Sequence, residues 1–182
     1  MSLIRFMGGA QGAWQVLSQQ AVCGGNLPAA AYVDMCTADA PLTATPTWQL
    51  QGAVSNLRYA THSEVVALKS IQQDLGRAAA HYAALIPIKK SAAWWALAQD
   101  ERRAIFEETS HHTAIGLDYL PAIARRLHHC RDLGNEPFDF LTWFEFAPEH
   151  SNDFDTMLQR LRATHEWRFV EREIEIRLVR GL

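Results

Sequence analysis

FDFLTWFEF, residues 138–146, is the stretch of this sequence that decides the fold. Its side chains alternate in character with a period of two, which is the period of a β-strand. One face carries aromatic rings and a threonine, and the other carries a mixed set: Phe138, Phe140, Thr142, Phe144 and Phe146 against Asp139, Leu141, Trp143 and Glu145. The pattern predicts a strand that packs against a core and, secondarily, forms the wall of a pocket.

The segments around this strand show helical and extended patterns. Apolar residues recur with helical spacing in several segments before it and directly after it. These patterns predict helices over residues 91–97, 100–111, 117–130 and 152–164, followed by a last strand over residues 166–178.

The first half of the chain has a different character. Residues 1–60 are rich in Gly, Ala, Thr and Pro and poor in charge, which indicates strands and loops, with strands at residues 31–36 and 48–59. A helix is expected from Ser63 to Leu75, and Gly76 would end it. In a short strand over residues 85–90, Pro87 indicates an edge or a bulge. The order of elements predicts an α+β fold with an antiparallel sheet.

Composition limits the class of protein. The 182 residues carry 17 basic and 20 acidic side chains, a net charge of -3, with a pI near 6.2. This balance provides no basic field for nucleic acid or an anionic membrane. No stretch reaches the roughly 18 consecutive apolar residues of a membrane span, and residues 1–12 lack the pattern of a signal peptide. One domain is the default, although a duplicated pair of small halves also fits.

Few residues indicate chemistry by pattern alone. The three cysteines match no metal ribbon or redox pair, so reduced thiols in a cytoplasmic protein are expected. Two histidine doublets, His111-His112 and His128-His129, raise the possibility of a metal site. Neighbours on a helix point about 100° apart, and no further ligands complete a tetrahedral set, so solvated or hydrogen-bonded histidines are favoured. Arg125 lies off the apolar stripe of its predicted helix, as a solvated charge would.

Several longer segments nevertheless resemble one family when taken together. They are IPIKKSAAWW at 86–95, SHH at 110–112, YLPAIARRL at 119–127, FDFLTWFE at 138–145, LRATHEW at 161–167 and VERE at 170–173. In content and spacing they resemble the chlorite dismutase family of haem b proteins, over roughly residues 47–180, and the short N-terminal half resembles its compact, dimeric branch. The resemblance implies two ferredoxin-like halves, residues 1–80 and a haem-binding half at 81–182, that form an antiparallel dimeric α/β-barrel as one compact unit.

The resemblance also assigns roles around a haem iron. His112 matches the proximal ligand and Arg125 the distal arginine, whose permanent charge suits an anion. Glu166 matches the carboxylate that accepts a hydrogen bond from the proximal imidazole, with Glu171 as the alternative.

Further positions match residues that hold the cofactor or line its pocket. Lys90 and Trp94 match positions that hold the haem propionates, and Tyr59 adds a contact at the haem edge. Thr142 and Phe144 match residues of the distal pocket and its entrance.

The function implied is conversion of chlorite to chloride and dioxygen, with O–O bond formation at the haem iron. One haem b per subunit, a homodimer and a cytoplasmic detoxifying role are expected with it. The alternatives are a coproheme decarboxylase and a haem-binding protein without catalysis. Ile86 stands where firmicute decarboxylases carry a redox-active tyrosine, and Arg125 is present where they commonly lack it, so both positions favour chlorite chemistry.

Overall fold

The computed structural model describes residues 3–42, 44–54 and 59–180. Within them eight strands close into one barrel in the order β1-β3-β2-β8-β5-β7-β6-β4, and every neighbouring pair is antiparallel. The strands are β1 (Leu3–Gly9), β2 (Trp14–Cys23), β3 (Tyr32–Thr37), β4 (Trp48–Val54), β5 (Tyr82–Lys90), β6 (Ala124–His129), β7 (Phe140–Phe146) and β8 (Val170–Arg180). The prediction of an α+β fold with an antiparallel sheet is therefore confirmed.

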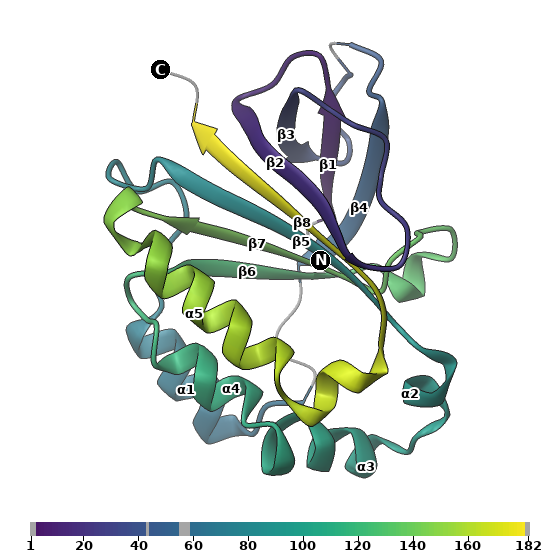
Figure 1. Cartoon of the computed structure of the whole chain (residues 1–182), viewed down its shortest axis with the longest axis vertical. Helices are drawn as coiled ribbons and strands as arrows, with labels where there is room; N and C mark the ends of the chain where they lie inside the picture. The colour runs from purple at the N-terminus through teal and green to yellow at the C-terminus, as the bar shows by residue number, and fades with distance from the viewer. Residues whose placement is uncertain (1–2, 43, 55–58, 181–182) are drawn as a thin grey trace.

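The helices lie on the outside of this barrel. They are α1 (His62–Ile71), α2 (Ala92–Ala96), α3 (Gln99–Arg103), α4 (His112–Leu117) and α5 (Ser151–Arg162), with a π-helical segment at Ala104–Thr109 and 3-10 turns at Arg131–Leu133, Pro148–His150 and His165–Phe169. Figure 1 shows α1, α4 and α5 grouped together beside β6 and β7, with α2 and α3 beyond them. None of these helices has the length and apolarity that a membrane span requires.

The strands β5 and β7 bury both of their faces, and this creates two separate cores. The barrel interior is filled by apolar side chains from most of the strands, among them Phe6, Trp14, Val33, Leu50, Leu85, Trp143 and Ile176. The outer face packs against α4 and α5 through Ala84, Ile86, Phe144, Phe146, Ile115, Phe154, Met157 and Leu158. Each fully buried large side chain contributes about 1.5–3 kcal/mol. The predicted alternation of residues 138–146 is thus confirmed over β7.

The helix predicted for residues 117–130 is wrong. In the structure α4 ends at Leu117, where this helix was expected to begin, residues 118–123 form turns, and β6 follows at Ala124–His129. Pro121 lies between them, where its missing N–H and its ring stop a helix. From Ala124 onward successive side chains point to opposite faces of the sheet, because β6 pairs with β7 along its whole length. Arg125 therefore lies on a strand. The apolar helical stripe from which a solvated position was predicted for Arg125 is not present in the structure.

Smaller boundaries also differ from the sequence predictions. The helix α1 is capped by Thr61 and ends at Ile71, not at Leu75, because the backbone is extended at Gln72. Pro87 lies on neither an edge nor a bulge, since β5 pairs with both β7 and β8. On the side of β8, residues 86 and 87 have no paired partner. The missing N–H of the proline therefore removes no hydrogen bond of this ladder. The predicted strand at residues 48–59 ends at Val54 within the described residues, and residues 55–58 lie outside them.

Gly52 makes room where β4 meets β6. A Cβ at this position would lie 2.6 Å from Cβ of His128 and 3.2 Å from Sγ of Cys130. We expect Gly52→Ala to lower the free energy of unfolding by about 1–3 kcal/mol, because buried side chains must shift to admit the methyl group. Urea unfolding measures this. Gly25→Ala is the control, since nothing lies within 4 Å of its Cβ; equal losses in the two variants would contradict the close packing of this seam.

Candidate functional site

His112 is the first residue of α4, and the backbone before it determines where its side chain lies. His111 has a left-handed conformation, with φ 52°, and separates the preceding π-helical segment from α4. Its side chain is exposed, whereas His112 points into the protein. The carboxylate of Glu107 accepts hydrogen bonds from the backbone N–H groups of Thr113 (2.6 Å) and Ala114 (3.3 Å), which satisfies the free end of the helix. The two neighbouring histidines therefore have different environments.

A buried carboxylate bridges His112 and a lysine. Nδ1 of His112 lies 2.7 Å from Oε2 of Glu166, and Nζ of Lys90 donates to Oε1 at 2.6 Å. The side chains of Glu166 and Lys90 are 4% and 5% exposed, so the pair is withdrawn from water. Because Lys90 can only donate and the carboxylate can only accept, Nδ1 of the imidazole donates to Glu166, and Nε2 is the ring nitrogen that remains for another partner.

The charge state of Glu166 follows from its partners. Burial alone raises the pKa of this carboxyl, but the positive charges and hydrogen bonds of His112 and Lys90 outweigh it and lower the pKa to about 2. Glu166 is therefore a carboxylate at any working pH. A fixed negative charge behind an imidazole makes the ring a stronger electron donor.

Aromatic rings fix the plane of the His112 imidazole. The ring of Phe106 stacks on it with centroids 4.4 Å apart and planes inclined by 22°, and the indole of Trp167 lies nearly parallel at 6.1 Å. Trp167 is itself held by a hydrogen bond of 2.7 Å from its indole N–H to Glu173, a carboxylate that also pairs with Arg162. Neither Phe106 nor Trp167 was predicted from the sequence as a site residue, although Trp167 directly follows Glu166.

Two adjoining cavities of about 80 Å³ each collect the predicted site residues. The first is lined by His112, Glu166, Lys90, Trp94, Tyr59 and Thr142, among others. The second is lined by His112, Arg125, Thr142 and Phe144, together with apolar residues from β5 and α5. All eight residues selected from the sequence therefore come together on the outer face of β5, β6 and β7. Thr113, which was not predicted from the sequence either, lines the second cavity.

Arg125 contributes an unpaired cation to this second cavity. No described residue forms a hydrogen bond or ion pair with its guanidinium, in contrast to Arg103 and Arg162, which pair with carboxylates. The guanidinium packs against Gly116 on α4, where a Cβ would collide with Nη1. Burial lowers the pKa of Arg125 to about 10, which still leaves it charged at neutral pH. A half-buried cation without a partner among the described residues is poorly compensated, so the position suits an anion.

Nε1 of Trp94 and the hydroxyl of Tyr59 are buried without a hydrogen-bond partner among the described residues, and both residues line the first cavity. The hydroxyl of Thr113, at the second cavity, is buried in the same way. Lys90, by contrast, directs its ammonium at Glu166 and lies 4.6 Å above the ring of Trp94. Glu171, the alternative partner for the imidazole, pairs with Lys89 on the surface, so Glu166 alone takes that place. Among the described residues no group of three or more His, Cys, Asp or Glu side chains is arranged to hold a bare metal ion.

The chain is similar to known proteins over most of its length. The sequence model of the chlorite dismutase family matches residues 32–180. The crystal structure of a dimeric chlorite dismutase from Nitrobacter winogradskyi is 57% identical, covers 98% of this chain and 99% of that one, and superposes with a TM-score of 0.90. The crystal structure of a mutant chlorite dismutase from Candidatus Nitrospira defluvii is 29% identical, with 75% and 56% of the two chains covered, and gives a TM-score of 0.61.

A curated relative adds a shorter match. The chlorite dismutase of Ideonella dechloratans is 37% identical over 67 residues, which cover 37% of this chain and 22% of that protein. The match thus spans about a fifth of the length of this relative. The protein is a closed antiparallel barrel with a pocket on its helix-covered face. This pocket holds both the imidazole of the histidine–glutamate pair and a guanidinium that has no partner among the described residues. The chain belongs to the chlorite dismutase family.

The bridge through Glu166 makes a pH-dependent contribution to stability. Its pKa in the folded protein lies below the ordinary value of 4.5, so the contribution is present above about pH 4.5 and is lost as the pH falls toward 2. We expect Glu166→Gln to lower the free energy of unfolding by about 3 kcal/mol at pH 7, because Lys90 is left buried without a counter-charge. The deficit should shrink as the pH falls below about 4.5.

Urea unfolding at pH 7, 4 and 3 measures this difference. The matched control is Glu171→Gln, which removes a carboxylate from an exposed pair with Lys89 and should cost less than about 1 kcal/mol. A deficit for Glu166→Gln that stays constant over this range would contradict the charged bridge.

Proposed function

We propose that the protein is a haem-dependent chlorite dismutase, which converts chlorite to chloride and dioxygen. The single observation that carries the proposal is the guanidinium of Arg125, which has no partner among the described residues and lines the same cavity as His112, the histidine paired with Glu166. A cation beside a metal-binding imidazole suits an anionic substrate. Membership of the family and the likeness to the Nitrobacter winogradskyi chlorite dismutase support the same activity.

The donor set fits a haem. Nε2 of His112 is the nitrogen left for the iron, because Nδ1 is engaged by Glu166. Nε1 of Trp94 and the hydroxyl of Tyr59 are buried donors without partners among the described residues, as carboxylate groups of a ligand require. Lys90 adds a positive charge beside them, although its ammonium also serves Glu166.

The chain's own residues would act in two ways around the cofactor. Haem iron, when bound, supplies the oxygen transfer and the O–O bond formation of this reaction. Arg125 would attract chlorite and keep chlorine oxyanions inside the pocket by charge-assisted hydrogen bonds. Thr142 and Phe144 on β7 would line the same pocket, and the apolar surround of Phe144 and Ile86 would exclude water.

The assembly and location belong to the same proposal. A homodimer with one haem b per subunit is supported by the likeness to a dimeric relative. The division into two ferredoxin-like halves, residues 1–80 and 81–182, is supported by the resemblance to the family. A cytoplasmic, detoxifying role is the one that the sequence favours.

The role of Arg125 is testable with haem-reconstituted protein and an oxygen electrode. We expect one dioxygen per chlorite from the wild type. Arg125→Ala should lower kcat/KM by about 10-fold or more and shorten the catalytic lifetime, since the charge that attracts and retains the anion is gone. Arg125→Lys, which keeps the charge but not the fork of donors, should lose less. Unchanged dioxygen yield and lifetime in Arg125→Ala would refute the clamp.

The role of His112 is tested by retention of the cofactor. His112→Ala should lose haem retention and activity together, because the nitrogen that would bind iron is removed. His111→Asn is the control, since this neighbouring side chain is exposed, asparagine tolerates the left-handed backbone, and the ferric Soret spectrum should stay unchanged. Haem titration followed by the Soret band measures both variants. A normal ferric spectrum for His112→Ala would show that another residue holds the iron.

A further inference from the structure

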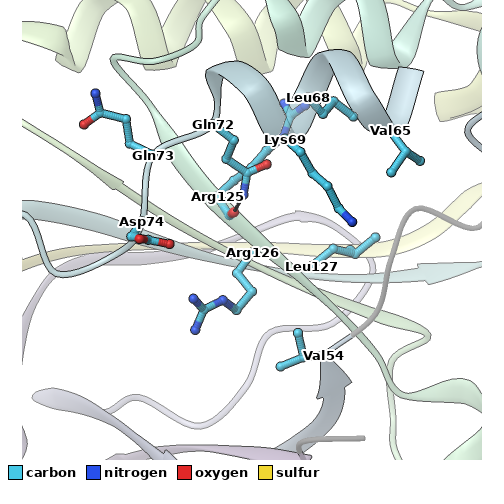
Figure 2. Close-up of a pocket in the computed structure, with 10 residues that line it drawn as sticks. All are labelled: Val54, Val65, Leu68, Lys69, Gln72, Gln73, Asp74, Arg125, Arg126 and Leu127. Carbon is cyan, nitrogen blue, oxygen red and sulfur yellow. Dashed lines mark hydrogen bonds between the residues drawn. The ribbon is translucent and has the colours of Figure 1, made fainter. Parts of the chain in front are cut away.

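A larger cavity lies outside the pocket just described, between α1 and β6. It has a volume of about 340 Å³. Figure 2 shows its ten lining residues, with Val65, Leu68, Lys69 and Gln72 on α1 or just after it, and Arg125, Arg126 and Leu127 on the strand below. Arg125 and Leu127 also line the inner cavity that reaches His112. These two side chains are therefore the wall that the outer and inner cavities share.

The lining of this outer cavity has an excess of positive charge. It includes three cations, Lys69, Arg125 and Arg126, and one carboxylate, Asp74. None of the three cationic groups forms an ion pair or hydrogen bond with a described residue. The excess is local, because the whole chain has a net charge of -3. Unpaired cations at a hollow in an otherwise acidic protein attract small anions.

Hydrogen bonds hold the end of α1, which carries Lys69, against the barrel. The side-chain amide of Gln72 donates to the backbone oxygen of Arg125 at 2.6 Å. Behind it, Arg77 donates to the backbone oxygens of Pro121 and Ala122, and Glu145 accepts from the backbone N–H of Gly76 at 2.5 Å. The end of α1 is thus tied to β6 and β7. Lys69 lies one turn before Gln72, so its backbone is held at the mouth while its long side chain stays exposed.

We propose that Lys69 and Arg126 form an anion-collecting mouth, which concentrates small oxyanions and delivers them to Arg125. The inference rests on the proposed function and adds the route and charge selection of the substrate. Lys69 and Arg126 act at a distance through their charge and need no contact with the reacting atoms. Their effect is on association, and it is screened by salt over a Debye length of about 10 Å at 0.1 M ionic strength. An uncharged ligand gains nothing from them.

The test uses the haem-loaded protein and two ligands of different charge. Nitrite is a bent oxyanion of the same charge as chlorite, and imidazole in its uncharged form is the neutral counterpart. Stopped-flow absorbance at several ionic strengths gives the association rate constant of each ligand. For the variant Lys69→Gln/Arg126→Gln we expect nitrite association to fall about 3- to 10-fold at low salt, with a flatter salt dependence. Imidazole association should stay unchanged, and kcat/KM for chlorite should fall while kcat holds.

The matched control is Lys89→Gln, which removes one positive charge from a lysine paired with Glu171 and lining neither cavity. It should leave nitrite association within about a factor of two of the wild type. Equal nitrite rates and equal salt slopes in wild type and double variant would overturn the mouth while leaving the dismutase intact. A double variant that slows nitrite and imidazole equally would also overturn it, since the loss would then be steric. A wild type that releases no dioxygen would instead refute the proposed function.

Discussion

The bridge from Lys90 through Glu166 to His112 is the interaction on which the site depends. It joins β5, the turn at His165–Phe169 and the start of α4, three segments far apart in the chain. A carboxylate this deeply buried is tolerated only because both of its oxygens accept charge-assisted bonds. The same two bonds fix the tautomer of the imidazole and set which nitrogen faces the cavity. Structural and chemical constraints therefore coincide in one side chain.

The second constraint is the two-sidedness of the strands. A period of two sends successive side chains to opposite faces, so β7 supplies Trp143 to the barrel interior and Phe144 to the helix-covered face. The same rule places Arg125 beside the pocket while its neighbour Ala124 is turned away. Because the barrel is closed, its interior is filled with side chains, and the site has to lie outside, between the sheet and the helices.

The outer cavity and the pocket share this arrangement. Arg125 stands between them, with its backbone oxygen held by Gln72 and its guanidinium left without a partner among the described residues. Arg125 thus has a backbone that is held in place and a charged side chain that remains available to a ligand. Packing against Gly116 leaves the guanidinium room, which a larger residue on α4 would fill. The protein thus holds a cation at a half-buried position, where partial loss of water disfavours its charge unless an anion binds.

The sequence by itself determined the local structure that repeats with a simple period. The alternation of residues 138–146 specified β7, and the helical spacing of residues 152–164 specified α5 within two residues. The resemblance to the family named eight of the residues that line the two cavities. Without that resemblance, pattern analysis would have left Arg125 as a solvated charge. Its helical stripe was drawn over a segment that pairs as a strand.

Only the tertiary structure decided which segments meet. The apolar content of residues 117–130 is compatible with a helix or a strand, and pairing of β6 with β7 settles the choice. Likewise, no local pattern shows that Glu166 accepts from Lys90, or that Lys69 and Arg126 share a cavity. Such contacts join residues that are distant in sequence. They form because burial of apolar surface drives the closure of the barrel, and this closure brings the polar side chains of the same segments together. The physical reason is that burial is a property of the whole chain, whereas periodicity is a property of each segment.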